Sequence, residues 1–126
     1  MNFPADLKYT DSHEWAAIDD TTAIVGITDY AQNELGDIVF VGLPEVGDEV
    51  TAGEAFADVE SVKAVSEMYC PVSGTVSEVN EKLFDDPAAI NEDPYDAWFI
   101  KVESVGDTVD LMDVDAYQAH CENESH

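Results

Sequence analysis

Residues 59–66 of the chain read Val-Glu-Ser-Val-Lys-Ala-Val-Ser, with a lysine between two short apolar runs. The runs have the composition of β-strands, and serine is frequent in turns, so the segment predicts a hairpin with Lys63 at its tip. Lysine is scarce here, because the chain has 4 lysines and no arginine. An amine at an outward bend is accessible to an enzyme that attaches a cofactor to a side chain. The hairpin alone does not exclude a solvated surface lysine.

The composition predicts one folded domain. The chain has 126 residues, 45% hydrophobic and 10% aromatic, which is enough for a core without cross-links. Cys70 and Cys121 are far apart in sequence and match neither a disulfide framework nor a zinc spacing, so we expect reduced thiols in a cytoplasmic protein. The N-terminus lacks a basic segment followed by an apolar block, and no apolar run approaches about 18 residues. Neither secretion nor a membrane span is expected.

Acidic residues dominate the charge of the chain. There are 29 Asp and Glu residues against 4 Lys and Arg residues, for a net charge of −25. Contacts with phosphates and anionic lipids need clustered Lys or Arg, so nucleic acids and anionic membranes are excluded as partners. In about 1 M salt the Debye length falls to roughly 3 Å, which would screen the repulsion between the acids. The charge therefore favours a halophilic source.

Short β-type runs alternate with turn signals along the chain, a pattern typical of a small all-β sandwich or barrel. Strands are expected at residues 7–10, 13–18, 23–27, 37–41, 55–59, 64–69, 75–79 and 98–102. A turn and a strand precede Lys63, and a strand and a turn follow it. Two halves arranged in this way can pack as a flattened barrel with the lysine hairpin at one end.

Three helices are expected between or after these strands, at residues 28–35, 85–90 and 113–122. Thr28 or Asp29 would cap the first helix, and Gly36 can end it. In the last helix, Val114, Tyr117 and Cys121 fall on one face.

No metal site is predicted. His120, Cys121 and His126 gather near the C-terminus, but Cys121 falls on the apolar face of the expected helix. His13 is expected to have a structural or surface role rather than to act as a ligand or base.

An ordered series of motifs runs nearly from end to end of the chain. It consists of residues 7–9 (Leu-Lys-Tyr), 12–15 (Ser-His-Glu-Trp), 26–32 (Gly-Ile-Thr-Asp-Tyr-Ala-Gln), 35–44 (Leu-Gly-Asp-Ile-Val-Phe-Val-Gly-Leu-Pro), 59–64, 71–74 (Pro-Val-Ser-Gly), 90–91 (Ile-Asn) and 94–98. Together these motifs resemble the H-protein family of the glycine cleavage system, whose members carry a lipoyl group. The lysine motif alone would be a weak signal, whereas the ordered series is specific.

The resemblance implies a fold and a role. The fold would be mainly β, a lipoyl-type barrel-sandwich hybrid with short helices and a C-terminal helix. The chain would form a single lipoyl-carrier domain over residues 1–126, with the core lipoyl-binding region at about 23–103 and the C-terminal helix at about 113–122. Lys63 would carry lipoate in amide linkage, and the chain itself would catalyse nothing.

The resemblance also implies partners. A pyridoxal-phosphate-dependent glycine decarboxylase (P protein) would transfer an aminomethyl group to the lipoyl sulfur. An aminomethyltransferase (T protein) would release ammonia and pass the one-carbon unit to tetrahydrofolate. Dihydrolipoyl dehydrogenase (L protein) would reoxidise the dithiol, and a further enzyme would attach the lipoate.

In the family, a cleft shelters the aminomethyl-bearing arm. The matching residues here are Ser12, Glu14 and Glu67, and some members have Asp at the position of Glu67. Taken without the motifs, Glu14 would be one more solvated acid and Ser12 a turn or cap residue.

Three other functions stay open at this point. One is a lipoyl or biotinyl carrier domain of another multienzyme complex, although those domains lack the motifs at residues 12–15 and 94–98. A second is an enzyme that uses Lys63 directly through a Schiff base, which needs a lowered lysine pKa that surrounding acids oppose. The third is an unmodified acidic binding module.

Overall fold

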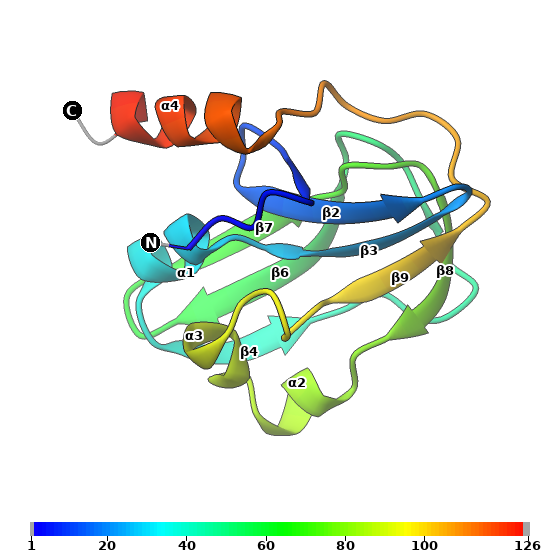
Figure 1. Ribbon diagram of the computed structural model, residues 1–126. Coiled ribbons are helices and arrows are strands. Elements are labelled where there is room, and N and C mark those ends of the chain that lie inside the picture. The colour runs from blue at the N-terminus through cyan, green and yellow to red at the C-terminus, as the bar shows by residue number, and fades with distance from the viewer. Residues whose placement is uncertain (1, 125–126) are drawn as a thin grey trace.

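The computed structural model describes residues 2–124 and shows two antiparallel β-sheets with helices around their edges (Figure 1). The strand order is β1-β2-β3-β9-β8-β5 in the larger sheet and β4-β6-β7 in the smaller. The strands are β1 (Lys8–Tyr9), β2 (Glu14–Asp19), β3 (Thr22–Ile27), β4 (Ile38–Gly42), β5 (Glu49–Val50), β6 (Ala55–Ser61), β7 (Val65–Tyr69), β8 (Gly74–Val79) and β9 (Ile100–Glu103). The prediction of a mainly β fold is confirmed.

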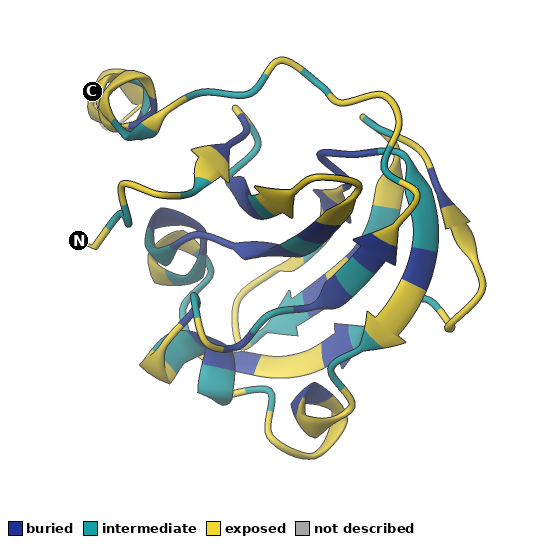
Figure 2. Ribbon diagram, turned by 45° about the vertical axis from the view of Figure 1, so that its right-hand side comes forward, coloured by how far each residue is buried: buried dark blue, intermediate teal, exposed yellow. Residues whose placement is uncertain are grey.

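The main core lies between the two sheets, where the buried segments of the strands face one another (Figure 2). The alternation along β6 shows the cause: Ala57 and Val59 are buried, whereas Asp58 between them is exposed. Val59 packs in one cluster with Val25 of β3 and with Phe99, and all three are 0% exposed. Burying an apolar side chain of this size contributes about 1.5–3 kcal/mol. Packing between the sheets therefore fixes the position of the β6–β7 hairpin.

Four helices connect or follow the strands within residues 2–124: α1 (Asp29–Leu35), α2 (Lys82–Asp85), α3 (Ala89–Glu92) and α4 (Val114–Glu124). The prediction of α1 is confirmed, with Thr28 as its cap, because the Oγ1 of Thr28 accepts a hydrogen bond from the Ala31 N–H at 3.2 Å. Gly36 ends the helix at φ +79°, in the left-handed region that favours glycine. No described helix is long and apolar enough to span a membrane.

A second, aromatic cluster joins α4 to β1 and β2. Its buried members are Tyr9, Trp15, Tyr30, Tyr117 and Cys121. The rings of Tyr9 and Tyr117 stack with their centroids 4.6 Å apart and their planes 7° from parallel. The predicted apolar face of the last helix is therefore confirmed, because Tyr117 and Cys121 are the buried residues of α4.

Two sequence predictions are wrong in detail, and one short strand was not predicted. The helix expected at residues 85–90 is two one-turn helices, α2 and α3, because Pro87 holds the preceding Asp86 out of helical geometry at φ −138° and ψ 69°. The strand expected at 98–102 begins only at Ile100, although the Phe99 N–H still donates to the Val25 carbonyl at 2.8 Å. The two-residue strand β5 was not predicted, since it is too short to show an alternating pattern.

Candidate functional site

Lys63 lies at the tip of the β6–β7 hairpin, as the sequence predicted. The strands pair in the register Val59 to Ser66 and Glu60 to Val65. The turn between them closes through Ser61, whose N–H donates to the Ala64 carbonyl at 2.8 Å. The Ser61 Oγ accepts from the N–H groups of Lys63 at 3.3 Å and Ala64 at 3.1 Å. One serine therefore fixes the shape of the lysine turn.

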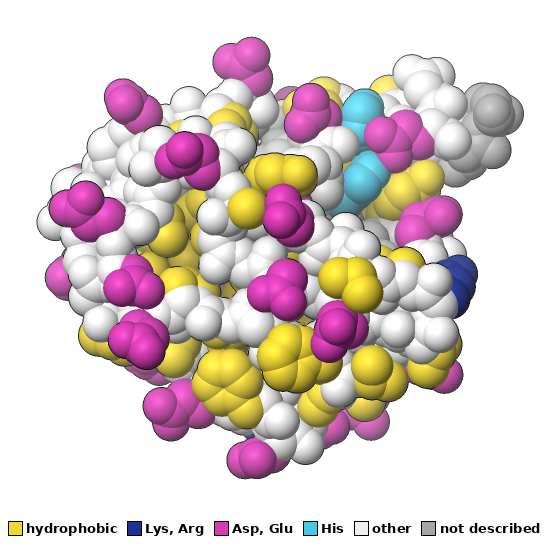
Figure 3. All heavy atoms as spheres, turned by 180° about the vertical axis from the view of Figure 1, so that it is seen from behind, with side chains coloured by type: hydrophobic (Ala, Val, Ile, Leu, Met, Phe, Trp, Pro, Cys, Tyr) yellow, Lys and Arg dark blue, Asp and Glu magenta, His cyan; other side chains and the backbone are white. Residues whose placement is uncertain are grey.

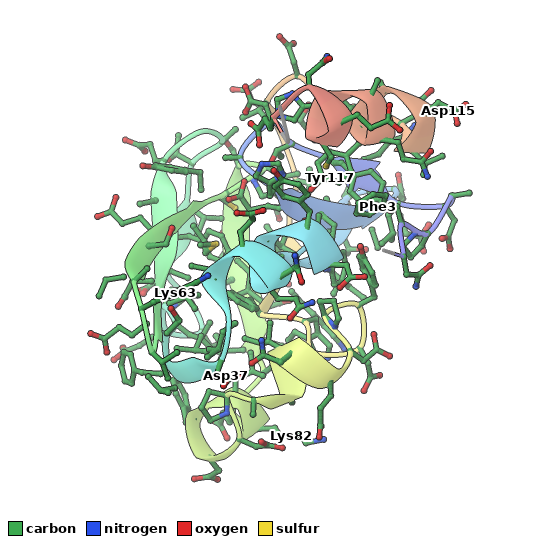
Figure 4. All side chains as sticks on the ribbon, turned by 90° about the vertical axis from the view of Figure 1, so that its left-hand side faces the viewer. Phe3, Asp37, Lys63, Lys82, Asp115 and Tyr117 are labelled. Carbon is green, nitrogen blue, oxygen red and sulfur yellow. The ribbon has the colours of Figure 1, made fainter. Side chains whose placement is uncertain are left out.

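A contact with the rest of the molecule holds the tip in place. The Val62 N–H donates to the Asp37 carbonyl at 3.0 Å, which ties the turn to the segment after α1. The Lys63 side chain passes over Gly36, where an added Cβ would lie 3.4 Å from the Lys63 Cε. Figure 4 shows Lys63 beside the C-terminal end of α1. The aliphatic part of the Lys63 side chain thus packs on the backbone of Gly36, where no side chain stands in its way.

The side chain of Asn91 in α3 supports this backbone from the other side. Its Oδ1 accepts from the Ile38 N–H at 2.9 Å, and its Nδ2 donates to the Gly36 carbonyl at 2.8 Å and to the Gln32 Oε1 at 3.0 Å. Asn91 therefore holds the segment on which the lysine turn rests. From sequence, Asn91 stands out only as part of the motif at residues 90–91, and nothing in that motif indicates these contacts.

The Lys63 amine faces solvent. Lys63 is exposed, and among residues 2–124 no carboxylate lies within ion-pair distance of its Nζ. Its neighbours Val62 and Val65 are 68% and 69% exposed, which is unusual for valine and surrounds the amine with apolar surface. Figure 3 shows that such apolar patches on this acidic molecule lie between the carboxylates.

Ser12 and Glu14 come together in one hydrogen-bonded group. Glu14 is only 1% exposed, and its Oε1 accepts from the hydroxyls of Ser12 at 2.5 Å and Thr10 at 2.6 Å. Its Oε2 accepts from the Tyr69 N–H at the end of β7, at 3.2 Å. Burial raises the pKa of the Glu14 carboxyl, although these hydrogen bonds oppose the shift. Glu14 is therefore a partnered buried acid and not a solvated one.

A pocket of about 490 Å³ opens beside this group. Two segments line most of it, the loop before β2 and the end of β7 with the residue that follows. The lining residues are Thr10, Asp11, Ser12, Glu14, Gly53, Tyr69, Cys70, Val109 and Asp110. Strand β7 thus leads from the lysine turn directly to the pocket wall.

Glu67 does not line this pocket, so the structure does not bring the three predicted cleft residues together. Glu67 lies opposite Asp58 in the β6–β7 ladder and lines a separate hollow with residues of β4 and β6. Side chains alternate along a strand, and the buried Met68 fixes the register that turns Glu67 outward. Thr10, which no motif singled out, takes part in the pocket instead.

The chain matches the family model described as glycine cleavage H-protein over residues 7–124. The chain belongs to this family. It is 52% identical to the glycine cleavage system H protein of Lachnoclostridium phytofermentans over 125 residues, which cover 98% of each chain. It is 56% identical to that of Geobacillus kaustophilus over 122 residues, which cover 94% of this chain and 96% of that protein.

A solved structure of the same family has the same fold. The crystal structure of a glycine cleavage system H protein from Mycobacterium marinum superimposes with a TM-score of 0.90 at 42% identity. The match covers 97% of this chain and 99% of that one. The predicted H-protein fold is therefore confirmed, and the family match favours it over a carrier domain of another multienzyme complex.

Proposed function

We propose that this chain is the lipoyl carrier of a glycine cleavage system and that Lys63 carries the lipoyl group in amide linkage. The observation that carries the proposal is the exposed Lys63 amine at the tip of a hairpin whose turn is fixed by Ser61. The family match over residues 7–124 supports the same role. The chain would act without catalysing a step, by presenting the group to the P, T and L proteins in turn.

The residues around Lys63 fit an attached acyl group. Amide formation removes the lysine charge, and the amine has no carboxylate partner among the described residues that would oppose this loss. Exposed Val62 and Val65 offer apolar surface to the arm, and Gly36 leaves space for its stem. When bound, the lipoyl group supplies a disulfide that opens to accept an aminomethyl group and is reformed by oxidation.

The pocket beside Ser12 and Glu14 would shelter the loaded end of the arm. A primary amine is cationic at neutral pH, and the Glu14 carboxylate is the buried acid of this pocket. An approaching cation favours the charged form of Glu14 and so lowers the carboxyl pKa that burial has raised. The Ser12 and Thr10 hydroxyls already hold the carboxylate in place. Glu67 is not part of this proposed site, because it lines another hollow.

The experiment compares Lys63→Arg with Lys82→Arg, an exposed lysine of α2 that serves as the matched control. Each protein is produced with a lipoate-attaching enzyme and its intact mass is measured. Wild type and Lys82→Arg should gain one lipoyl group, and Lys63→Arg none. The first two should then accept one aminomethyl group from glycine in the presence of the decarboxylase. Lipoylation of Lys63→Arg, or aminomethyl loading of that variant, would refute the assignment.

A further inference from the structure

Two histidines and one glutamate meet at the end of α4, away from the lysine turn. His13 comes from the loop before β2, and His120 and Glu124 come from α4. The His13 Nε2 lies 2.6 Å from the Glu124 Oε2. The His120 Nε2 lies 3.1 Å from the Glu124 Oε1 and also donates to the Asp11 carbonyl at 3.0 Å, and zinc would take the place of that hydrogen. One potential ligand atom from each residue lies within 4.8 Å of the other two. The proposed carrier function uses none of these three side chains.

The helix and the loop both present their side chains to one point. His120 and Glu124 are four residues apart and therefore lie on the same face of α4. His13 adopts φ 74°, in the left-handed region that a residue with a Cβ seldom occupies. Its backbone is held on both sides, because its N–H donates to the Thr10 carbonyl at 3.2 Å and its carbonyl accepts from the Thr28 N–H at 3.0 Å. Such strain persists where the surroundings enforce it, and it concentrates at functional sites.

Further contacts orient the His13 ring. Its Nδ1 lies 2.7 Å from the hydroxyl oxygen of Tyr117, which in turn lies 2.7 Å from the Thr28 Oγ1. The ring also stacks on Tyr30, with the centroids 4.5 Å apart. The 2.6 Å contact shows Nε2–H donating to the Glu124 carboxylate. A metal ion between the two groups would replace this proton, with the remaining hydrogen on Nδ1 donated to Tyr117. Histidines that bind metals are held in the same way, with the second ring nitrogen bonded to a protein group.

We propose that His13, His120 and Glu124 form a binding site for a zinc ion. Two imidazoles and one carboxylate are a ligand set that zinc takes in proteins, with a fourth position left to water. At zinc–ligand distances of about 2.0–2.1 Å, ligand atoms in a tetrahedral site lie about 3.3 Å apart. Two of the present separations are 2.6 and 3.1 Å and the third is at most 4.8 Å, so changes of at most about 1.5 Å in these separations reach this spacing. The net charge of −25 adds a field that attracts cations.

The site is accessible from solvent. The side chains of His13, His120 and Glu124 are 14%, 28% and 39% exposed. Figure 3 shows histidine side chains at the surface beside an acidic one. Zinc there would tie α4 to the loop that also carries Ser12, and so would stiffen one wall of the pocket described above. The site does not depend on the lipoyl proposal, and protein without lipoate tests it equally well.

The main test is a calorimetric titration of the metal-free full chain with zinc chloride in molar KCl, where the general attraction of the acidic surface is screened. We expect one zinc ion per chain. Glu124→Gln should weaken binding at least tenfold. Glu122→Gln is the matched control, because it removes the same charge from an exposed position of the same helix. Equal affinity of the two variants, or binding without a defined stoichiometry, would mean that the acidic surface alone attracts zinc, and the proposal would be wrong.

Three further measurements keep the result independent of folding defects. His13→Asn removes the ring ligand but keeps a residue that tolerates positive φ, so the variant should fold. Its zinc affinity should be at least tenfold lower than that of the wild type. Circular dichroism of each metal-free variant checks its fold. Wild-type chain titrated with Co²⁺ needs no substitution and should show the intense visible absorption of a tetrahedral cobalt–imidazole centre. The weak absorption of hydrated Co²⁺ would overturn the site.

Discussion

Replacing Gly26 by alanine should destabilise the fold by displacing Trp15. Gly26 on β3 lies directly opposite Trp15 on β2. A Cβ added at Gly26 would lie 2.8 Å from the Cε2, Cζ2 and Nε1 atoms of the indole. Because ordinary contact begins at 3.4 Å, the ring would have to recede by about 0.6 Å.

The indole has little room to recede. Trp15 is 3% exposed, its Nε1 donates to the Pro94 carbonyl at 3.2 Å, and its ring packs near that of Tyr95. Overpacking of this kind costs about 1–3 kcal/mol, and the reduced freedom of the unfolded chain with alanine offsets about 0.4–1 kcal/mol. A net loss of about 1–2 kcal/mol follows, which for a domain of this size lowers Tm by about 4–8 °C.

Thermal unfolding followed by circular dichroism in molar KCl measures the effect. Gly106→Ala is the matched control, because among residues 2–124, apart from its own chain neighbours, no atom lies within 4 Å of the added Cβ, and its stability should be unchanged. In a Trp15→Phe background the smaller ring should reduce the cost of Gly26→Ala, which a double-mutant cycle would detect. Equal Tm values for Gly26→Ala and Gly106→Ala would show that the added methyl group does not displace Trp15.

Four further predictions follow from other parts of the structure. Burial raises the pKa of the Cys70 thiol to about 11, so iodoacetamide should alkylate it far more slowly in the folded than in the unfolded chain, and equal rates would contradict this. Burial raises the pKa of Tyr9 to about 12, above its ordinary 10. Its contribution to stability is therefore present below about pH 10 and is lost as the pH rises toward 12. Denaturant titrations at increasing pH should show the free energy of unfolding fall over this range, and the fall should be smaller in Tyr9→Phe. Gly36→Ala should lower the free energy of unfolding by about 1–2 kcal/mol in denaturant titrations, because alanine is strained at φ +79°. Finally, Tm should rise from dilute buffer to molar KCl as the repulsion between the acids is screened, and an unchanged or lower Tm would argue against adaptation to salt.

The hairpin and α1 could be predicted from sequence because local signals determine both. Two short runs of β-type composition on either side of a serine-containing turn predict the pairing of β6 with β7, and Thr28 before a helical run predicts the cap. The limits of α2 and α3 could be inferred only in part, since Pro87 shows where helix cannot continue but not that two separate turns form beside it.

The pocket could be predicted less well, because contacts between distant residues decide it. Glu14 is one of 29 acidic residues, and nothing in its own segment shows that the Tyr69 N–H, 55 positions away, makes its burial tolerable. The orientation of Glu67 depends on the register of β7, which a shift of one residue would reverse. His13 and His120 are likewise 107 positions apart, so no ligand spacing is visible before the chain folds.

The support that Asn91 gives to the lysine turn limits how this hairpin can be reused. Residues 55–69 grafted onto an unrelated scaffold would keep the Ser61 turn but would lose the Asp37 carbonyl that receives the Val62 N–H. They would also lose the α1–β4 junction that the Asn91 amide holds in place. A transplantable modification tag taken from this chain would therefore need residues 32–38 and 89–92 as well, and so would be a small domain and not a peptide.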